Sequence, residues 1–222
     1  MEQRGNILSE LLPFWKDLKE SEKKQITENT TKHFYENKQN IHGGLGDCTG
    51  IIAIKSGGLR VYLLSEEGKQ VTLFRLLEND VCLLSASCIM KNISFDINID
   101  AECPTELFIT SASCYDKISK DNPAVENFMR ELVSMRFSEA MWAMEQILFM
   151  KFDKRLAIFL IGQAKLENGD TISLTHEQIA SHLGSAREVV SRMLKYFSNE
   201  GIISLSRKDI KILDRKRLTE YI

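Results

Sequence analysis

The spacing of hydrophobic and polar residues changes several times along the chain, and each change marks a different kind of element. A helical opening is predicted over residues 6–30. From 33 to 113, glycines separate short runs of β-branched and aromatic residues, such as 51–54 and 59–63. Many short strands at this spacing are typical of a barrel or jelly roll. The polar segment 65–69 lies between two apolar runs, so it predicts a hairpin turn.

A long helix is predicted over residues 122–150, because no glycine interrupts this stretch and Pro123 stands where a helix can begin. Its apolar residues form two stripes, and a single barrel can cover only one of them. The second stripe predicts a partner helix, most simply the same helix of another subunit. A helix buried wholly within one subunit is the alternative. The predicted dimerisation residues are Phe128, Leu132, Met135, Trp142 and Phe149 in the first stripe, and Phe137, Met141, Met144 and Leu148 in the second.

Two short helices around Gly184 form the next pattern, after a further predicted helix at 154–168. Thr175 and the three residues after it have the form of a capping box. A second helix is predicted from Ser185, with polar residues on its outer face. This is the shape of a helix-turn-helix, whose second helix enters the major groove of DNA. The apolar runs 201–205 and 210–213 flank a basic tip and predict a β-hairpin wing. Hairpins of helices that never bind DNA share the shape, so the wing and the charge decide between the two interpretations.

The charge of the chain is unevenly distributed, although its formal total is only −2. Residues 171–222 hold nine Lys and Arg against six Asp and Glu, whereas residues 1–170 hold twenty against twenty-five. The C-terminal quarter is therefore the part expected to approach phosphate.

Composition excludes several classes of protein. The 222 residues are 43% hydrophobic and 27% charged, which is typical of globular proteins. No stretch has the length of a membrane span and the N-terminus has no signal-peptide pattern, so we expect a cytoplasmic protein. Five cysteines without a CxxC pair favour reduced thiols over a disulfide framework or a zinc site. No catalytic motif stands out, so an enzyme is not expected.

The chain resembles the Crp/Fnr family of bacterial transcription regulators. The resemblance lies in the helix-turn-helix segments 174–184, 186–195 and 201–203, and in the barrel segments 54–61, 66–69 and 77–80. It implies an α+β chain in three parts. These are a cyclic-nucleotide-binding-like jelly roll (1–120), a dimerisation helix (121–151) and a winged helix-turn-helix (152–222). It also implies double-stranded DNA, a second copy of the chain and RNA polymerase as partners.

The predicted recognition helix carries Glu188, Ser191 and Arg192 in the E-x-x-S-R form of one family branch. The resemblance implies an inverted repeat with half-sites like TTGAT and ATCAA. Arg192 can donate to guanine, Glu188 can accept from cytosine, and Ser191 can meet a thymine edge. Glu188 could instead only cap its helix. The residues expected to contact the DNA backbone are Thr175, Ser185, Arg187, Lys195, Arg207 and Lys208.

The effector is not evident from the sequence. Where the family's cyclic-AMP branch has an arginine for the phosphate, this chain has none between Arg75 and Arg130, so cyclic AMP is not expected. The possible effector region is Cys82, Ser85, Ser87 and Cys88, although a buried cysteine is more often a small apolar residue. A haem, held by His33 and His42, or an iron–sulfur cluster remains an alternative without a supporting signature. The rival to a DNA reader is a ligand-binding or protein-interaction module whose outer helix face lacks base-reading groups.

Overall fold

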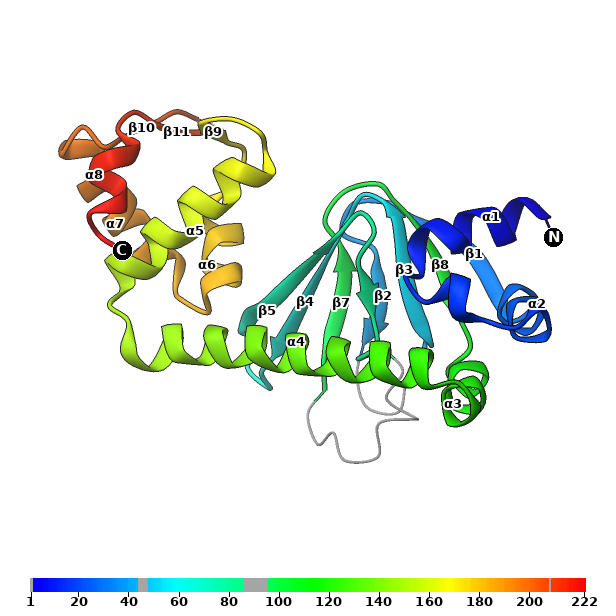
Figure 1. The fold of residues 1–222 in the computed structure, drawn as a ribbon. Coiled ribbons are helices and arrows are strands. Elements are labelled where there is room, and N and C mark those ends of the chain that lie inside the picture. The colour runs from blue at the N-terminus through cyan, green and yellow to red at the C-terminus, as the bar shows by residue number, and fades with distance from the viewer. Residues whose placement is uncertain (1, 44–47, 86–95, 208) are drawn as a thin grey trace. The chain divides into compact units, whose positions relative to one another are not determined.

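The computed structural model describes residues 2–43, 48–85, 96–207 and 209–222, and Figure 1 shows its elements. The chain forms two compact units. Met1–Leu63 and Leu73–Ala140 make up the first, and Leu64–Thr72 and Met141–Ile222 make up the second. The described residues of the first unit form two hydrophobic cores, and those of the second unit form one.

The first unit contains two antiparallel four-stranded sheets and helices. The helices are α1 (Glu2–Leu11), the 3-10 helix η1 (Trp15–Asp17), α2 (Glu20–Glu28) and α3 (Ala112–Asp121). One sheet has the order β1 (Thr30–Tyr35), β8 (Thr105–Thr110), β3 (Ile51–Ser56) and β6 (Val81–Cys82). The other has the order β2 (Asn40–Gly43), β7 (Asn98–Ala101), β4 (Gly58–Leu64) and β5 (Gln70–Leu77). This is the β-rich unit that the strand pattern predicted.

Strand β3 is buried on both faces, which explains its unbroken apolar run. Ile52 and Ile54 point into the core between the two sheets. Ile51 and Ala53 point the other way, into a second core formed with α1, α2 and α3. Because side chains alternate along a strand, four consecutive apolar residues serve two cores.

Helix α4 (Pro123–Phe149) begins at the predicted proline and runs for 27 residues. One of its faces packs on the first unit, where Val125 and Leu132 are buried and Phe128 contacts the ring of Phe14 at a centroid distance of 5.0 Å. Phe128 and Leu132 were expected at a subunit interface. Leu132 is instead buried in the chain's own core, whereas Phe128 is partly buried and packs against that core.

The remaining apolar residues of α4 are exposed in the single chain. Phe137 is 67% exposed, Leu148 63% and Phe149 81%. The other predicted interface residues on this helix that are exposed are Met135, Met141, Trp142 and Met144. A large apolar surface on one helix therefore lacks a covering element among the described residues.

Arg136 is the charged residue on the inner face of α4, and only 3% of its side chain is exposed. Its guanidinium donates to the backbone carbonyl of Val81 at 3.3 Å and to the Glu139 carboxylate at 2.8 Å. The carboxylate of Asp80 lies 3.8 Å away. These contacts attach the middle of α4 to the strand β6 region of the barrel.

The second unit is a winged helix-turn-helix. Its helices are α5 (Phe152–Leu166), α6 (His176–Leu183), α7 (Arg187–Asn199) and α8 (Arg215–Thr219). Its three-stranded antiparallel sheet has the order β10 (Ile203–Leu205), β11 (Ile210–Ile212) and β9 (Thr171–Ile172). Apolar residues from α5, α6, α7 and all three strands make one core. The predicted wing is confirmed in the pairing of β10 with β11.

Several elements were not predicted. The N-terminal opening is divided, because Pro13 cannot continue α1 and disfavours helix at the residue before it. Helix α3 fills residues that were assigned to the end of the barrel and to a connection. Strand β9 has only two residues, too few for a periodic pattern.

Candidate nucleic-acid interface

The first helix of the motif is fixed at both ends by local side-chain and backbone chemistry. The Thr175 hydroxyl accepts a hydrogen bond from the backbone N–H of Gln178 at 3.2 Å. In return, the backbone N–H of Thr175 donates to the side-chain oxygen of Gln178 at 2.9 Å. These two bonds are the predicted capping box. At the other end Gly184 adopts a left-handed conformation with φ 60° and turns the chain toward α7.

Helix α7 has one face in the core and one toward solvent. Val190, Leu194 and Phe197 are completely buried. Glu188 and Arg192 stand four positions apart, so they share the opposite face, and both are exposed. The core contacts of α7 therefore fix which of its side chains are presented.

The carboxylate of Glu188 is not used to cap the helix. The N-cap position is Ala186 rather than Ser185, and no side chain makes a capping hydrogen bond there. Within the part of the chain that the structure describes, the side chains of Glu188, Arg192 and Lys195 make no hydrogen bond or ion pair. One acidic and two basic side chains on the exposed face of α7 thus have no hydrogen-bond or ion-pair partner among the described residues.

Ser191 differs from its two neighbours in the predicted triplet. It is half-buried, and its Oγ lies 2.8 Å from Nδ1 of His176, the first residue of α6. The sequence pattern did not single out His176, because a bond between two helices depends on how they cross. Burial and the nearby Arg187 guanidinium lower the pKa of His176.

The residues expected to contact the DNA backbone have mostly accessible side chains. Thr175, Arg187, Lys195 and Arg207 are exposed and Ser185 is half-buried, whereas Lys208 lies outside the described residues. Two further arginines near the C-terminus have internal partners. The Arg215 guanidinium pairs with Asp170 at 2.5 Å, and that of Arg217 pairs with Glu200 at 3.2 Å. Part of the positive charge of the C-terminal quarter is therefore structural.

The possible effector region is only partly described, since Ser87 and Cys88 lie outside the described residues. Cys82 belongs to the core between the sheets, and burial raises the pKa of its thiol. The hydroxyl of buried Ser85 donates to the backbone carbonyl of Gly50 at 2.6 Å. Both side chains therefore have packing or bonding roles in the barrel. Cys48 is disulfide-bonded, which differs from the expectation of five reduced thiols.

The two histidines considered for haem each lie within hydrogen-bonding distance of a threonine hydroxyl. His33 bonds with the neighbouring Thr31 hydroxyl at 2.8 Å on β1, and Nδ1 of buried His42 lies 2.9 Å from the hydroxyl of Thr49. Among the described residues, no three His, Cys, Asp or Glu side chains gather where they could hold a metal ion.

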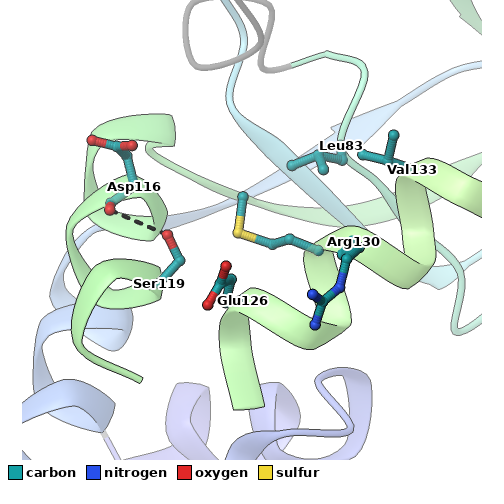
Figure 2. A pocket seen from close by; sticks show the side chains of 7 residues that line it. Leu83, Asp116, Ser119, Glu126, Arg130 and Val133 are labelled. Carbon is teal, nitrogen blue, oxygen red and sulfur yellow. Dashed lines mark hydrogen bonds between the residues drawn. The ribbon is translucent and has the colours of Figure 1, made fainter. Parts of the chain in front are cut away.

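A shallow hollow of about 330 Å³ lies between α3 and the first half of α4. Figure 2 shows its wall, where the Ser119 hydroxyl donates to the backbone carbonyl of Asp116 at 3.2 Å. The lining mixes apolar side chains with groups of both charges, so it selects no single charge in a ligand. The lining residues are Leu83, Asp116, Ser119, Glu126, Met129, Arg130 and Val133.

Comparison with known proteins identifies the type of protein. Residues 154–221 match the Crp-like helix-turn-helix domain. A solved structure from Eubacterium rectale, assigned to a transcriptional regulator of the Crp/Fnr family, is 47% identical, with a TM-score of 0.92. The match covers 96% of this chain and 99% of that one. The chain belongs to the Crp/Fnr family.

More distant members of the Crp/Fnr family match over most of the chain. The anaerobic regulatory protein of Haemophilus influenzae is 29% identical over 77% of this chain and 68% of its own. The cAMP-activated global transcriptional regulator of Pasteurella multocida is 25% identical over 81% of this chain and 88% of its own. This chain is accordingly a DNA-binding transcription regulator of the Crp/Fnr type and not an enzyme. In the described parts of the chain, no helix is long and apolar enough to cross a membrane.

Proposed function

We propose that this regulator binds, as a homodimer, an inverted DNA repeat with half-sites like TTGAT and ATCAA. An effector acting on the part formed by residues 1–120 controls the binding, and residues 121–151 and 152–222 supply the dimer helix and the DNA reader. The observation that carries the proposal is that the side chains of Glu188 and Arg192 are exposed on α7 and make no hydrogen bond or ion pair among the described residues. Binding to chromosomal DNA would place the protein in the cytoplasm and beside RNA polymerase.

The side chains of Glu188 and Arg192 together match the hydrogen-bonding groups of one G·C base pair. The Arg192 guanidinium can donate two hydrogen bonds to guanine O6 and N7, and the Glu188 carboxylate can accept from cytosine N4. Glu188 and Arg192 stand four positions apart, about one helical turn, so both can reach the same groove. Lys195 stands one turn further along and suits a phosphate contact.

The exposed stripe of α4 supports a dimer. Phe137, Met141, Met144 and Leu148 follow one another at steps of three or four residues and so form one continuous apolar face. A second copy of the helix, related by a two-fold axis, presents the same face in return. Two recognition helices related by that axis read an inverted repeat.

The effector in this proposal is not cyclic AMP. Asp100 stands in the region where the family's cyclic-AMP branch binds its ligand, and its carboxylate accepts from the Asn40 amide at 2.8 Å. A carboxylate here opposes a cyclic phosphate. Calorimetric titration with cyclic AMP and cyclic GMP tests this point, and we expect no heat of binding at micromolar concentrations. Saturable binding to residues 1–120 would overturn it.

Selection from a random pool of duplex oligonucleotides tests the DNA site. We expect wild type to enrich an inverted repeat, and Arg192→Ala to lose about 1–3 kcal/mol per half-site together with the preference at the G·C pair. Lys195→Ala is the matched control, since loss of a phosphate contact weakens all sequences alike and flattens the salt dependence. The proposal fails if wild type, supplied with extract of its native host as the source of effector, enriches no inverted repeat. It also fails if Arg192→Ala keeps the same preference.

A further inference from the structure

The bond between His176 and Ser191 joins the two helices of the DNA-binding motif. Fifteen positions separate the two residues along the chain, and only 2.8 Å separates Nδ1 from Oγ. His176 begins α6, and Ser191 lies next to Arg192 on α7. The histidine ring therefore contacts α7 directly beside its candidate base-reading groups.

A serine hydroxyl has one proton and two lone pairs, so one fixed partner determines what it can offer another. If Nδ1 accepts the hydroxyl proton, Ser191 can only accept from a base. If Nδ1 carries a proton, it donates to Oγ, and the hydroxyl proton is free to reach an acceptor such as thymine O4. In either case the bond also limits rotation of the serine side chain.

We infer that His176 is a positioning residue for DNA recognition, which orients the Ser191 hydroxyl and sets whether it donates to or accepts from a base. The inference rests on the proposed function, because Ser191 must reach a base edge for its hydroxyl to matter. It extends the recognition site from one helix to two.

The charges around His176 act in two directions. Burial lowers the pKa of the His176 ring in the free protein, and the positive charge of Arg187 on α7 acts in the same direction. The positive N-terminal end of α6 also disfavours a charged ring at its first position. Phosphates of bound DNA oppose these effects. Because the pKa in the free protein lies below the ordinary value of 6.5, the His176 ring is neutral when the protein approaches DNA at a pH above 6.5. A neutral ring has two tautomers, which differ in whether Nδ1 carries the proton.

Four variants and a control separate the roles. His176→Ala removes the partner of Ser191, whereas His176→Asn places an amide where Nδ1 stood and keeps a hydrogen-bonding group for Oγ. Ser191→Ala removes the other side of the bond, and the double variant His176→Ala with Ser191→Ala completes the cycle. Glu177→Ala is the control, because Glu177 is the exposed neighbour of His176 on α6.

The measurement is the affinity of each full-length variant for duplexes that differ at one base pair of the repeat enriched by wild type. We expect His176→Ala to lose about two- to tenfold of the preference at the pair read by Ser191, the range for one neutral hydrogen bond. The preference at the Arg192 pair should stay unchanged. Ser191→Ala should lose the same amount of this preference, and the double variant should lose no more than either single variant. We expect His176→Asn and Glu177→Ala to change the preference little.

Other outcomes overturn the inference in distinguishable ways. An equal loss of affinity for every duplex in His176→Ala would make His176 a backbone or structural contact. Additive losses in the double variant would show that the two residues act separately. If wild type enriches a repeat but Ser191→Ala changes no position, the positioning role fails while DNA binding stands. If wild type enriches nothing, the proposed function fails as well.

Imidazole nitrogen shifts in the free protein test the bond without DNA and without removing His176. We expect the Nδ1 signal of His176 to move in Ser191→Ala relative to wild type. An unchanged signal would contradict the contact on which the inference depends.

Discussion

The guanidinium carbon of Arg136 lies 5.1 Å from the centre of the Phe74 ring, so a cation of α4 packs against an aromatic residue of β5. A cation at this distance from a ring face is attracted by the ring electrons. Together with the bonds of Arg136 to Val81 and Glu139, this contact makes the arginine an anchor between helix and barrel.

Replacing this anchor should destabilise the first unit. We expect Arg136→Ala to lower the free energy of unfolding by about 1–3 kcal/mol, through lost packing and lost hydrogen bonds. The carboxylate partners are partly exposed, so the variant leaves no buried charge without a partner. Urea unfolding measures the loss, and Arg130→Ala, at an exposed position of the same helix, is the control. Equal midpoints for the two variants would contradict the anchoring role.

The turn of the helix-turn-helix depends on a left-handed residue. Gly184 has φ 60°, and an L side chain in this conformation costs about 1–2 kcal/mol. We therefore expect Gly184→Ala to lower the thermal midpoint of unfolding. Gly162→Ala serves as the comparison, because an added methyl group there meets open space inside α5 and should raise stability by up to about 1 kcal/mol. A neutral effect of Gly184→Ala would argue against the turn.

The exposed face of α4 should control assembly. We expect Phe137→Glu and Leu148→Glu each to yield monomers, because a two-fold dimer would bury two carboxylates without partners. Sedimentation velocity at micromolar concentration reads the result. Ser138→Glu is the matched control, since Ser138 lies seven residues from Glu131 and from Glu145 on a polar side of the helix. Dimers of Phe137→Glu as stable as wild type would rule out this interface.

Acid should weaken the second unit through His176. Its pKa is lowered on folding, so the folded state binds fewer protons than the unfolded state below about pH 6.5. The stability that depends on the neutral ring is complete above that pH and is lost as pH falls through the lowered pKa. We expect His176→Asn to flatten this part of the curve of unfolding free energy between pH 5 and 8. An identical curve for the variant would show that other groups cause the acid sensitivity.

Local chemistry explains what the sequence could predict about the DNA-binding motif. The capping box joins Thr175 to Gln178, only three residues away, and Gly184 follows directly after the helix it ends. Such signals need no knowledge of the fold. The outward face of α7 was predictable because Val190, Leu194 and Phe197 repeat at helical spacing and must point inward.

The missed features depend on contacts between distant segments. Arg136 looks like a surface residue of a helix until Val81, fifty-five positions earlier, is placed beside it. His176 likewise gains a role only when α6 crosses α7. Phe128 and Leu132 were assigned to a subunit interface because periodicity shows that a face is apolar without showing what covers it.

The burial of both faces of strand β3 has a consequence for how the first unit unfolds. It is hydrogen-bonded to β8 on one side and to β6 on the other, and its alternate side chains belong to two separate cores. Neither core can open without exposing residues that the other also depends on. We therefore expect the sheet sandwich and the N-terminal helices to unfold as one cooperative unit, with the amides of β3 among the last to exchange with solvent.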